Sequence, residues 1–212
     1  MNTHMDRRTT FNTNPQTYQK IRPKYPEALF DELVKVTQLR DSAQLLEIGP
    51  GTGQATEPLA KRGYIVTAIE LGKDLAQEAH DVLKDYKNVR ILTGAFEKVE
   101  LPAASFDLVY SATAFHWIKP EVQFTKPHRL LKLNGYLAII HTNHVSDEKG
   151  DAYFFATQPI YKKYNPSDDE NFRLPLIKDL KPAKIDEGFL HQYFLKSFRL
   201  SFDILPMSML NS

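Results

Sequence analysis

Residues 44–56, which read Q-L-L-E-I-G-P-G-T-G-Q-A-T, decide the fold of this chain. Gln44 to Ile48 form a short apolar run, which predicts a buried strand. The three glycines that follow predict a tight turn, and we expect a helix from Gln54 that Gly63 ends. A glycine-rich turn between a strand and a helix lets the backbone approach a ligand and aims helix N–H groups at an anionic group. The sequence therefore predicts an α/β domain with a ligand site at this turn.

The spacing of the glycines separates cofactor classes. The dinucleotide fingerprint G-x-G-x-x-G requires a glycine at position 54, where this chain has Gln54. A nucleotide-dependent oxidoreductase is therefore a disfavoured alternative. A second strand, expected over Tyr64 to Ile69, ends at Glu70, and a carboxylate about 20 residues beyond such glycines can accept both ribose hydroxyls of an adenosine cofactor.

Further strands and helices follow in alternation. Strands are expected over Val89 to Thr93, Ser105 to Ser111 and Tyr136 to His141. A helix should begin at Pro120, be divided by Pro127, and end at Asn134-Gly135; its expected buried side is Leu130, Leu131 and Leu133. This pattern predicts a Rossmann-like α/β fold, a doubly wound and mostly parallel sheet with helices on both faces.

Two groups of residues resemble a known family. E-x-G-x-G-x-G from Glu47 to Gly53, with Glu70-Leu71, resembles the first two motifs of class I S-adenosylmethionine-dependent methyltransferases of the type 11-like kind. A-T-A-F-H-W at 112–117, with Tyr18…Arg22-Pro23-x-Tyr25-Pro26, resembles the trans-aconitate methyltransferase group. The resemblance implies S-adenosylmethionine as cofactor and a small-molecule acceptor. It also implies these cofactor-binding residues: Glu47, Gly49, Pro50, Gly51, Gly53, Glu70, Leu71, Ala95, Phe96, Glu97, Ser111 and Ala112.

One position departs from the family pattern. The family often has an aspartate directly after the glycine that ends the third strand, where it can bond the adenine amino group, whereas this chain has Ala95. Backbone groups near Phe96 can still form hydrogen bonds with the edge of the adenine ring, and Glu97 is a candidate replacement for the missing carboxylate. A cofactor-binding protein without catalysis stays open as an alternative, favoured by Ala95 and by the short C-terminal region.

The substrate side is expected at the same sheet edge and its N-terminal cap. The candidate substrate-binding residues are Tyr18, Arg22, Phe115, His116, Trp117, Asn143 and His144. His116 is the candidate catalytic residue because its ordinary pKa lies near neutrality. Arg22 could orient a carboxylate acceptor by bidentate hydrogen bonds, whereas a hydroxyl or amine acceptor would need His116 or His144 as general base. The sequence does not decide between these acceptors.

Composition limits the other function classes. The 212 residues carry a formal net charge of +1 and no cysteine. This charge gives no electrostatic reason to expect a nucleic-acid partner, and a cysteine-free chain fits a cytoplasmic location. No apolar run is long enough to suggest a membrane span. We expect no metal site, because no third ligand accompanies the histidines near position 141. The oligomeric state is not determined by the sequence.

Residues 1–212 are expected to form a single methyltransferase domain. It divides into an N-terminal cap segment at 1–26, a cofactor-binding core at 27–144, a substrate lid at 145–188 and a C-terminal strand region at 189–212. A sixth strand is expected over Phe189 to Phe202, and little sequence then remains for a seventh. The sequence favours an incomplete C-terminal edge; in the alternative, residues 192–210 pair directly with the fifth strand.

Overall fold

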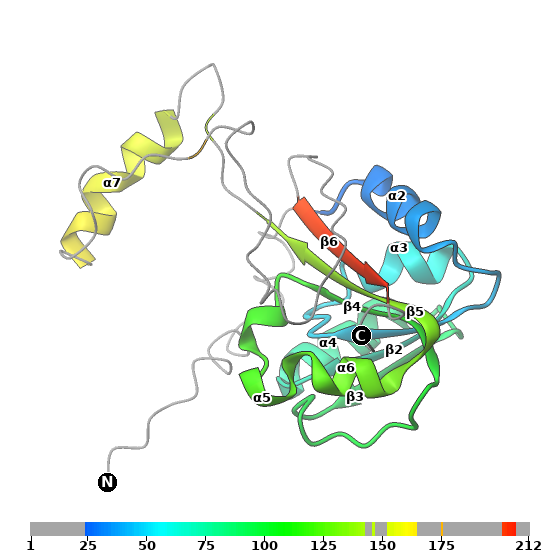
Figure 1. Cartoon of the computed structure of the whole chain (residues 1–212). Helices are drawn as coiled ribbons and strands as arrows, with labels where there is room; N and C mark the ends of the chain where they lie inside the picture. Colours follow the sequence, from blue (N-terminus) through cyan, green and yellow to red (C-terminus); the bar gives the residue numbers. More distant parts are fainter. Residues whose placement is uncertain (1–23, 143–145, 147–151, 165–174, 176–200, 207–212) are drawn as a thin grey trace, which may run out of the picture.

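The computed structural model describes residues 24–142, 146, 152–164, 175 and 201–206. Its centre is a six-stranded sheet in the order β3-β2-β1-β4-β5-β6, in which β6 alone runs antiparallel to its neighbour (Figure 1). The strands are β1 Gln44–Ile48, β2 Ile65–Glu70, β3 Val89–Thr93, β4 Phe106–Ala112, β5 Leu131–His141 and β6 Ser201–Pro206. The predicted Rossmann-like α/β fold is confirmed.

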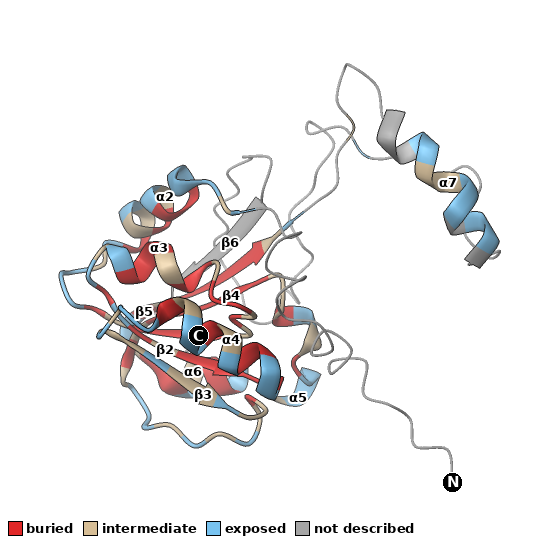
Figure 2. Ribbon diagram, turned by 180° about the vertical axis from the view of Figure 1, so that it is seen from behind, coloured by how far each residue is buried: buried red, intermediate tan, exposed pale blue. Residues whose placement is uncertain are grey.

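Helices cover both faces of this sheet. α3 and α4 lie on one face, and α6 lies on the opposite face, which the views from the two sides in Figures 1 and 2 show. Each face buries its own apolar cluster. One contains Phe30, Leu59 and Leu108, and the other contains Leu46, Val109 and Leu130. The helices are α2 Glu27–Thr37, α3 Thr56–Lys61, α4 Lys73–Leu83, the 3-10 turn η2 Phe115–Trp117, α5 Pro120–Gln123, α6 Thr125–Leu130 and α7 Ala152–Tyr164.

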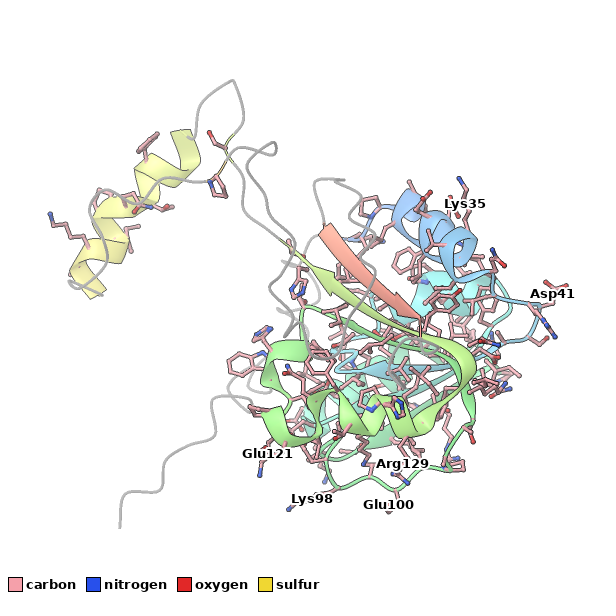
Figure 3. All side chains as sticks on the ribbon, in the orientation of Figure 1. Lys35, Asp41, Lys98, Glu100, Glu121 and Arg129 are labelled. Carbon is pink, nitrogen blue, oxygen red and sulfur yellow. The ribbon has the colours of Figure 1, made fainter. Side chains whose placement is uncertain are left out.

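Charged side chains of the loops and of α5 point outward. Figure 3 shows this for Asp41, Glu100 and Glu121. Among the described helices, none has the length and apolar character that crossing a bilayer requires.

Two helix predictions need correction. The helix expected from Gln54 begins at Thr56 instead, because Gln54 and Ala55 still belong to the turn that contains Gly53, whose φ is 90°. The helix expected to continue through Leu133 ends at Leu130, and Leu131 is already extended with φ −72° and ψ 142°. Leu133 is therefore not buried but 79% exposed at the start of β5. Pro127 does divide the segment as predicted, since α5 and α6 are separate helices.

The outer edge of β5 is paired, so the favoured expectation of an incomplete edge there is wrong. β6 forms an antiparallel ladder with β5, from Tyr136 opposite Pro206 to His141 opposite Ser201. The structure therefore agrees with the alternative prediction, in which C-terminal residues pair directly with the fifth strand. The pairing involves residues 201–206. Pro206 is tolerated because it ends an edge strand, where one missing N–H donor costs little. Most of the strand expected over Phe189 to Phe202 lies outside the described residues.

The cap and lid segments stay predictions. Of the expected cap, only residues 24–26 are described, and of the expected lid, residues 146, 152–164 and 175. The lid region contributes α7, which Figure 1 draws apart from the sheet.

Candidate functional site

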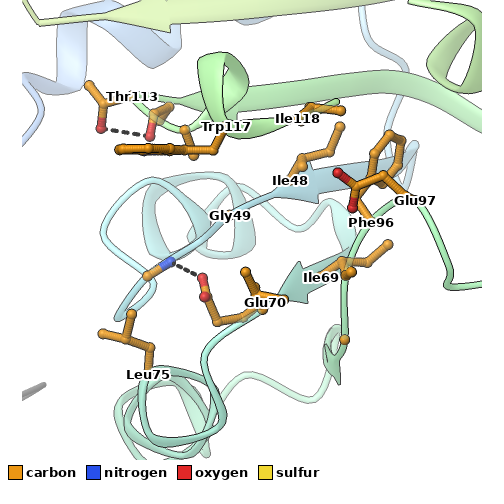
Figure 4. A pocket seen from close by; sticks show the side chains of 16 residues that line it. Ile48, Gly49, Ile69, Glu70, Leu75, Phe96, Glu97, Thr113, Trp117 and Ile118 are labelled. Carbon is orange, nitrogen blue, oxygen red and sulfur yellow. Dashed lines mark hydrogen bonds between the residues drawn. The ribbon is translucent and has the colours of Figure 1, made fainter. Parts of the chain in front are cut away.

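A pocket lies where β1, β2 and β4 end, at the carboxyl edge of the parallel strands (Figure 4). Ligands bind at this edge in open α/β sheets, because the loops that leave the strands there diverge to opposite faces. The lining residues are Ile48, Gly49, Gly51, Ile69, Glu70, Leu71, Leu75, Gly94, Ala95, Phe96, Glu97, Ala112, Thr113, Ala114, Trp117 and Ile118.

The glycine turn forms one wall of the pocket. Gly49 has a φ of 71°, and its N–H donates to the carbonyl of Ile69 at 2.9 Å. A Cβ at position 49 would lie 2.5 Å from the Cβ of Ala114, so only glycine lets the β1 and β4 loops approach this closely. Gly53 supports the turn from outside the pocket, since a Cβ there would lie 2.7 Å from Leu83.

Glu70 joins the turn to the end of β2. Its Oε2 accepts the N–H of Gly51 at 3.0 Å, and its Oε1 accepts the N–H of Gly72 at 2.8 Å. Figure 4 shows the first of these bonds at the pocket wall. The side chain is only 7% exposed, and burial raises the pKa of its carboxyl group, an effect that the N–H donors of Gly72, Gly51 and Leu71 partly offset. A carboxylate has about four lone-pair sites, so beside these three N–H groups Glu70 keeps about one site for a donor from a ligand.

The segment after β3 forms the opposite wall. It contributes Ala95, the buried Phe96 and Glu97. Gly94 fixes its start by donating its N–H to the carbonyl of Glu70 at 2.8 Å. Glu97 Oε1 accepts the backbone N–H of Lys119 at 3.1 Å, so this carboxylate is tied to the loop before α5.

Four of the predicted cofactor residues lie outside the pocket lining. Pro50 and Gly53 belong to the back of the glycine turn, and Ser111 donates its hydroxyl to the carbonyl of Ile48 at 2.8 Å inside the sheet. Glu47 is fully buried, and its Oε2 accepts the hydroxyls of Thr56 at 2.5 Å and Tyr110 at 2.8 Å. Successive side chains of a strand point to opposite faces, and the face that Glu47 occupies is covered by α3.

Burial raises the pKa of Glu47 to about 7, and the hydrogen bonds from Thr56 and Tyr110 oppose this rise. Its Oε1 has no hydrogen-bond partner among the described residues. This oxygen is therefore where a proton would reside in the neutral form.

On the predicted substrate side, Trp117 lines the pocket and His116 lies next to it, with ring centroids 4.8 Å apart. His116 is exposed, and partial burial lowers its pKa. Phe115 is instead in the core, packed edge-on against Phe124 at 5.3 Å. The candidates Tyr18, Arg22, Asn143 and His144 lie outside the described residues.

Several pocket residues were not predicted. Thr113 has a φ of 58°, rare for a β-branched residue, and its hydroxyl lies 3.3 Å from that of Tyr25. Thr113 and Ala114 belong to the A-T-A-F-H-W run, in which only Ala112, the aromatic residues and the histidine were predicted to be site residues. The other unpredicted lining residues lie at strand ends, in loops or, for Leu75, on α4: Ile48, Ile69, Leu75, Gly94 and Ile118. His141, at the end of β5, is not a lining residue; its pKa is lowered by burial and by nearby His116.

The described residues contain no cluster of three or more His, Asp or Glu side chains suited to a metal ion.

Comparison with known proteins shows which proteins this chain resembles. Residues 46–139 match the family model described as a methyltransferase domain. An uncharacterised methyltransferase-like protein of Schizosaccharomyces pombe is 32% identical over 133 residues, which are 62% of this chain and 50% of that protein. A probable ribosomal RNA small subunit methyltransferase A of Methanosarcina acetivorans is 27% identical over 203 residues, which cover 86% of this chain and 73% of that protein.

Among solved structures, a SAM-dependent methyltransferase from Aquifex aeolicus has a TM-score of 0.59, with 19% identity, 91% of this chain covered and 98% of that one. The chain spans only about half the length of the first curated relatives that it matches.

The sheet order, the glycine turn and these matches define the class I methyltransferase fold. Residues 46–139 are similar to a methyltransferase domain, and the fold around them is that of class I methyltransferases. The trans-aconitate group is not among the matches reported above, and assignment to it stays a prediction.

Proposed function

We propose that the chain is an S-adenosylmethionine-dependent methyltransferase that acts on a small molecule, with its cofactor in the pocket of Figure 4. One observation carries the proposal. Glu70 is a buried carboxylate at the pocket wall, and the N–H groups of Gly51 and Gly72 fix its orientation. Such a fixed acceptor is suited to a ribose hydroxyl, because hydrogen bonds to a charged acceptor are strong and directional.

The remaining walls fit the rest of the cofactor. The glycine turn at 49–53 is open to the amino-acid end, since Gly49 and Gly51 line the pocket without side chains. Ala95, Phe96 and Glu97 lie across the pocket and are suited to the adenine ring. The bound cofactor supplies the activated methyl group, so the protein has to bind, align and exclude water.

The acceptor would enter beside Trp117 and Thr113. His116 is available there as a general base, because its lowered pKa leaves the imidazole neutral near pH 7. This supports a hydroxyl or amine acceptor, whereas a carboxylate acceptor would rely on Arg22 in the N-terminal segment. We retain both, with the carboxylate favoured by the resemblance of the N-terminal segment to the trans-aconitate group.

RNA is a second candidate acceptor. The similarity to a probable ribosomal RNA methyltransferase over most of the chain favours it. The net charge of +1 argues against an RNA acceptor, since proteins that bind RNA generally have an excess of basic residues.

A turnover assay tests the proposal. S-adenosylhomocysteine release is measured with three classes of small molecule, namely carboxylic acids, phenols and amines, and with small-subunit ribosomal RNA. Turnover with a small molecule is expected, and turnover with RNA alone would overturn the small-molecule acceptor. Binding of S-adenosylmethionine without turnover on any acceptor would favour the non-catalytic alternative. His116→Gln should slow methylation of a phenol or amine, whereas the exposed His80→Gln on α4 serves as the matched control.

A further inference from the structure

Lys126 has an unusual environment for a lysine. It lies on α6, and the residue is only 7% exposed. Glu100 and Arg129, whose charged groups are 3.8 Å apart, instead extend to the surface nearby (Figure 3). Lysine ammonium groups are seldom buried unless each donor is satisfied.

The ammonium group of Lys126 reaches the wall of the pocket from behind. Its Nζ donates to the carbonyls of Phe96 at 2.6 Å, Val99 at 2.6 Å and Glu97 at 3.3 Å. The same nitrogen lies 5.1 Å from the centre of the Phe96 ring. An ammonium has three N–H donors, so all three are directed to one short segment, which we call the 95–99 turn.

These bonds fix which way the peptide groups of the turn face. In a trans peptide the C=O and N–H groups point in opposite directions, and no described peptide bond is cis. Because the carbonyl of Phe96 points to Lys126, the N–H of Glu97 points away from it. Ala95, Phe96 and Glu97 line the pocket, whereas Lys126 does not. The N–H of Glu97 therefore lies on the side of its peptide group away from Lys126, in a segment that lines the pocket.

We propose that Lys126 is a positioning residue for the base of the cofactor. It holds the 95–99 turn so that a backbone N–H donor meets a ring nitrogen of adenine. Ala95 has no side-chain hydrogen-bonding group, so backbone groups have to carry much of the base recognition at this wall. The positive charge also polarises the peptide groups that it contacts, which strengthens their N–H groups as donors. The inference rests on the proposed function, in that it requires adenine at this wall.

The test compares two ligands that differ only at the edge of the base. S-adenosylhomocysteine has an acceptor nitrogen at N1, whereas S-inosylhomocysteine carries a hydrogen there and cannot accept from a backbone N–H. Wild-type protein should prefer the adenine ligand in calorimetry. In Lys126→Met the affinity for S-adenosylhomocysteine should fall about tenfold, the equivalent of one hydrogen bond from a charged or polarised group. The affinity for S-inosylhomocysteine should change much less, so the ratio of the two affinities falls.

Lys132→Met is the matched control. Lys132 is also a lysine whose ammonium group is hydrogen-bonded within the domain. Its Nζ donates to Asp107 Oδ2 at 2.7 Å, but this contact lies at the amino end of β4. This variant should leave the ratio unchanged. If Lys126→Met fails to fold, Lys126→Gln replaces it; its shorter, uncharged side chain cannot reach all three carbonyls, and the ratio should again fall.

Three results would overturn the inference: an equal loss of affinity for both ligands, no loss for either, or an unchanged ratio in a folded Lys126→Gln. Failure of the proposed function is distinct from these, since wild-type protein would then bind neither ligand.

Discussion

Glu47 and Glu70 end neighbouring strands, yet their carboxyl groups meet different surroundings. Glu70 is satisfied by backbone N–H groups at the pocket wall, whereas Glu47 is enclosed between β1, β4 and α3 with one oxygen unpaired among the described residues. A buried carboxyl group of the second kind resists ionisation because its charge loses the solvation of water. We therefore expect substitutions of the two residues to have different effects.

Glu47 should make stability depend on pH. Its pKa is about 7 in the folded chain against 4.5 for the unperturbed group, so between these values the folded state binds more protons than the unfolded state. Stability then falls as pH rises from 4.5 to 7, and the loss levels off above pH 7. Replacing Glu47 by Gln removes this titration. The free energy of unfolding is measured with urea at pH 5 and at pH 8. Between these pH values it should fall by about 2–3 kcal/mol more in the wild type than in Glu47→Gln. The same loss in both proteins would contradict the assignment.

Glu70 should control cofactor affinity. Glu70→Gln replaces one acceptor oxygen by a donor amide and removes the charge, so bonds to the glycine turn and to the ribose weaken together. The affinity for S-adenosylmethionine should fall by about 1.5–3 kcal/mol, the usual value for a hydrogen bond to a charged group. Calorimetry measures the change. Glu100→Gln is the control, since that side chain is 85% exposed and does not line the pocket. Equal affinities for the two variants would refute the role of Glu70.

At the scale of elements, the pocket depends on how closely the β1 turn meets the segment after β4. Gly49→Ala should weaken cofactor binding and lower stability by about 1–3 kcal/mol, because it adds a strained φ and a collision with Ala114. The second substitution Ala114→Gly removes the colliding Cβ and should restore part of both losses. Gly63→Ala is the matched control: Gly63 has a φ of 87°, but a Cβ there meets nothing within 4 Å. Additive effects of the two substitutions in a double-mutant cycle would show that the contact is not energetically coupled.

Elements were predictable from sequence where apolar pattern and turn residues agreed. β1 and β3 have the bounds expected from their branched, apolar runs. The segment Leu131-Lys132-Leu133 was assigned wrongly to the helix that ends at Leu130, since its leucine spacing fits a helix face as well as a strand. Tertiary pairing decides it, because Leu131 pairs with Phe106 across an irregularity in the β4–β5 ladder. Pattern alone cannot reveal such a partner, as Phe106 is 25 residues away.

The site was predictable in part for a similar reason. Glycine spacing and Glu70 follow from local sequence, and Ala95, Phe96 and Glu97 follow from the end of a strand. Lys126 and Tyr25 reach the pocket wall and rim from distant parts of the sequence. No local pattern indicates Lys126, and the pattern that includes Tyr25 does not reveal its contact with Thr113. Glu47 shows the converse: its place in the motif suggested the cofactor, while the alternation of strand faces turns it to the core.

At the scale of the whole molecule, β6 completes the sheet beyond β5. Amides along Ser201–Pro206 that bond β5 should exchange slowly, while the alternate amides, which face away from β5 at the sheet edge, should exchange faster. Hydrogen exchange followed residue by residue by NMR measures this pattern, with β3 at the other edge as the reference. Uniformly fast exchange along 201–206 and along the facing part of β5 would contradict the pairing.

The β5–β6 ladder also has a consequence for synthesis of the chain. His141 pairs with Ser201, 60 residues further on, whereas the five parallel strands are complete once residue 141 is made. At about 5–20 residues per second, a translating ribosome needs roughly 3–12 s to supply the missing strand. During that interval the nascent sheet has an open edge of unpaired N–H and C=O groups at β5, the kind of edge that captures other extended chains. Nascent chains arrested with residues 1–142 outside the ribosome should therefore recruit strand-binding chaperones more strongly than the released chain, and equal recruitment would show that β5 is protected in another way.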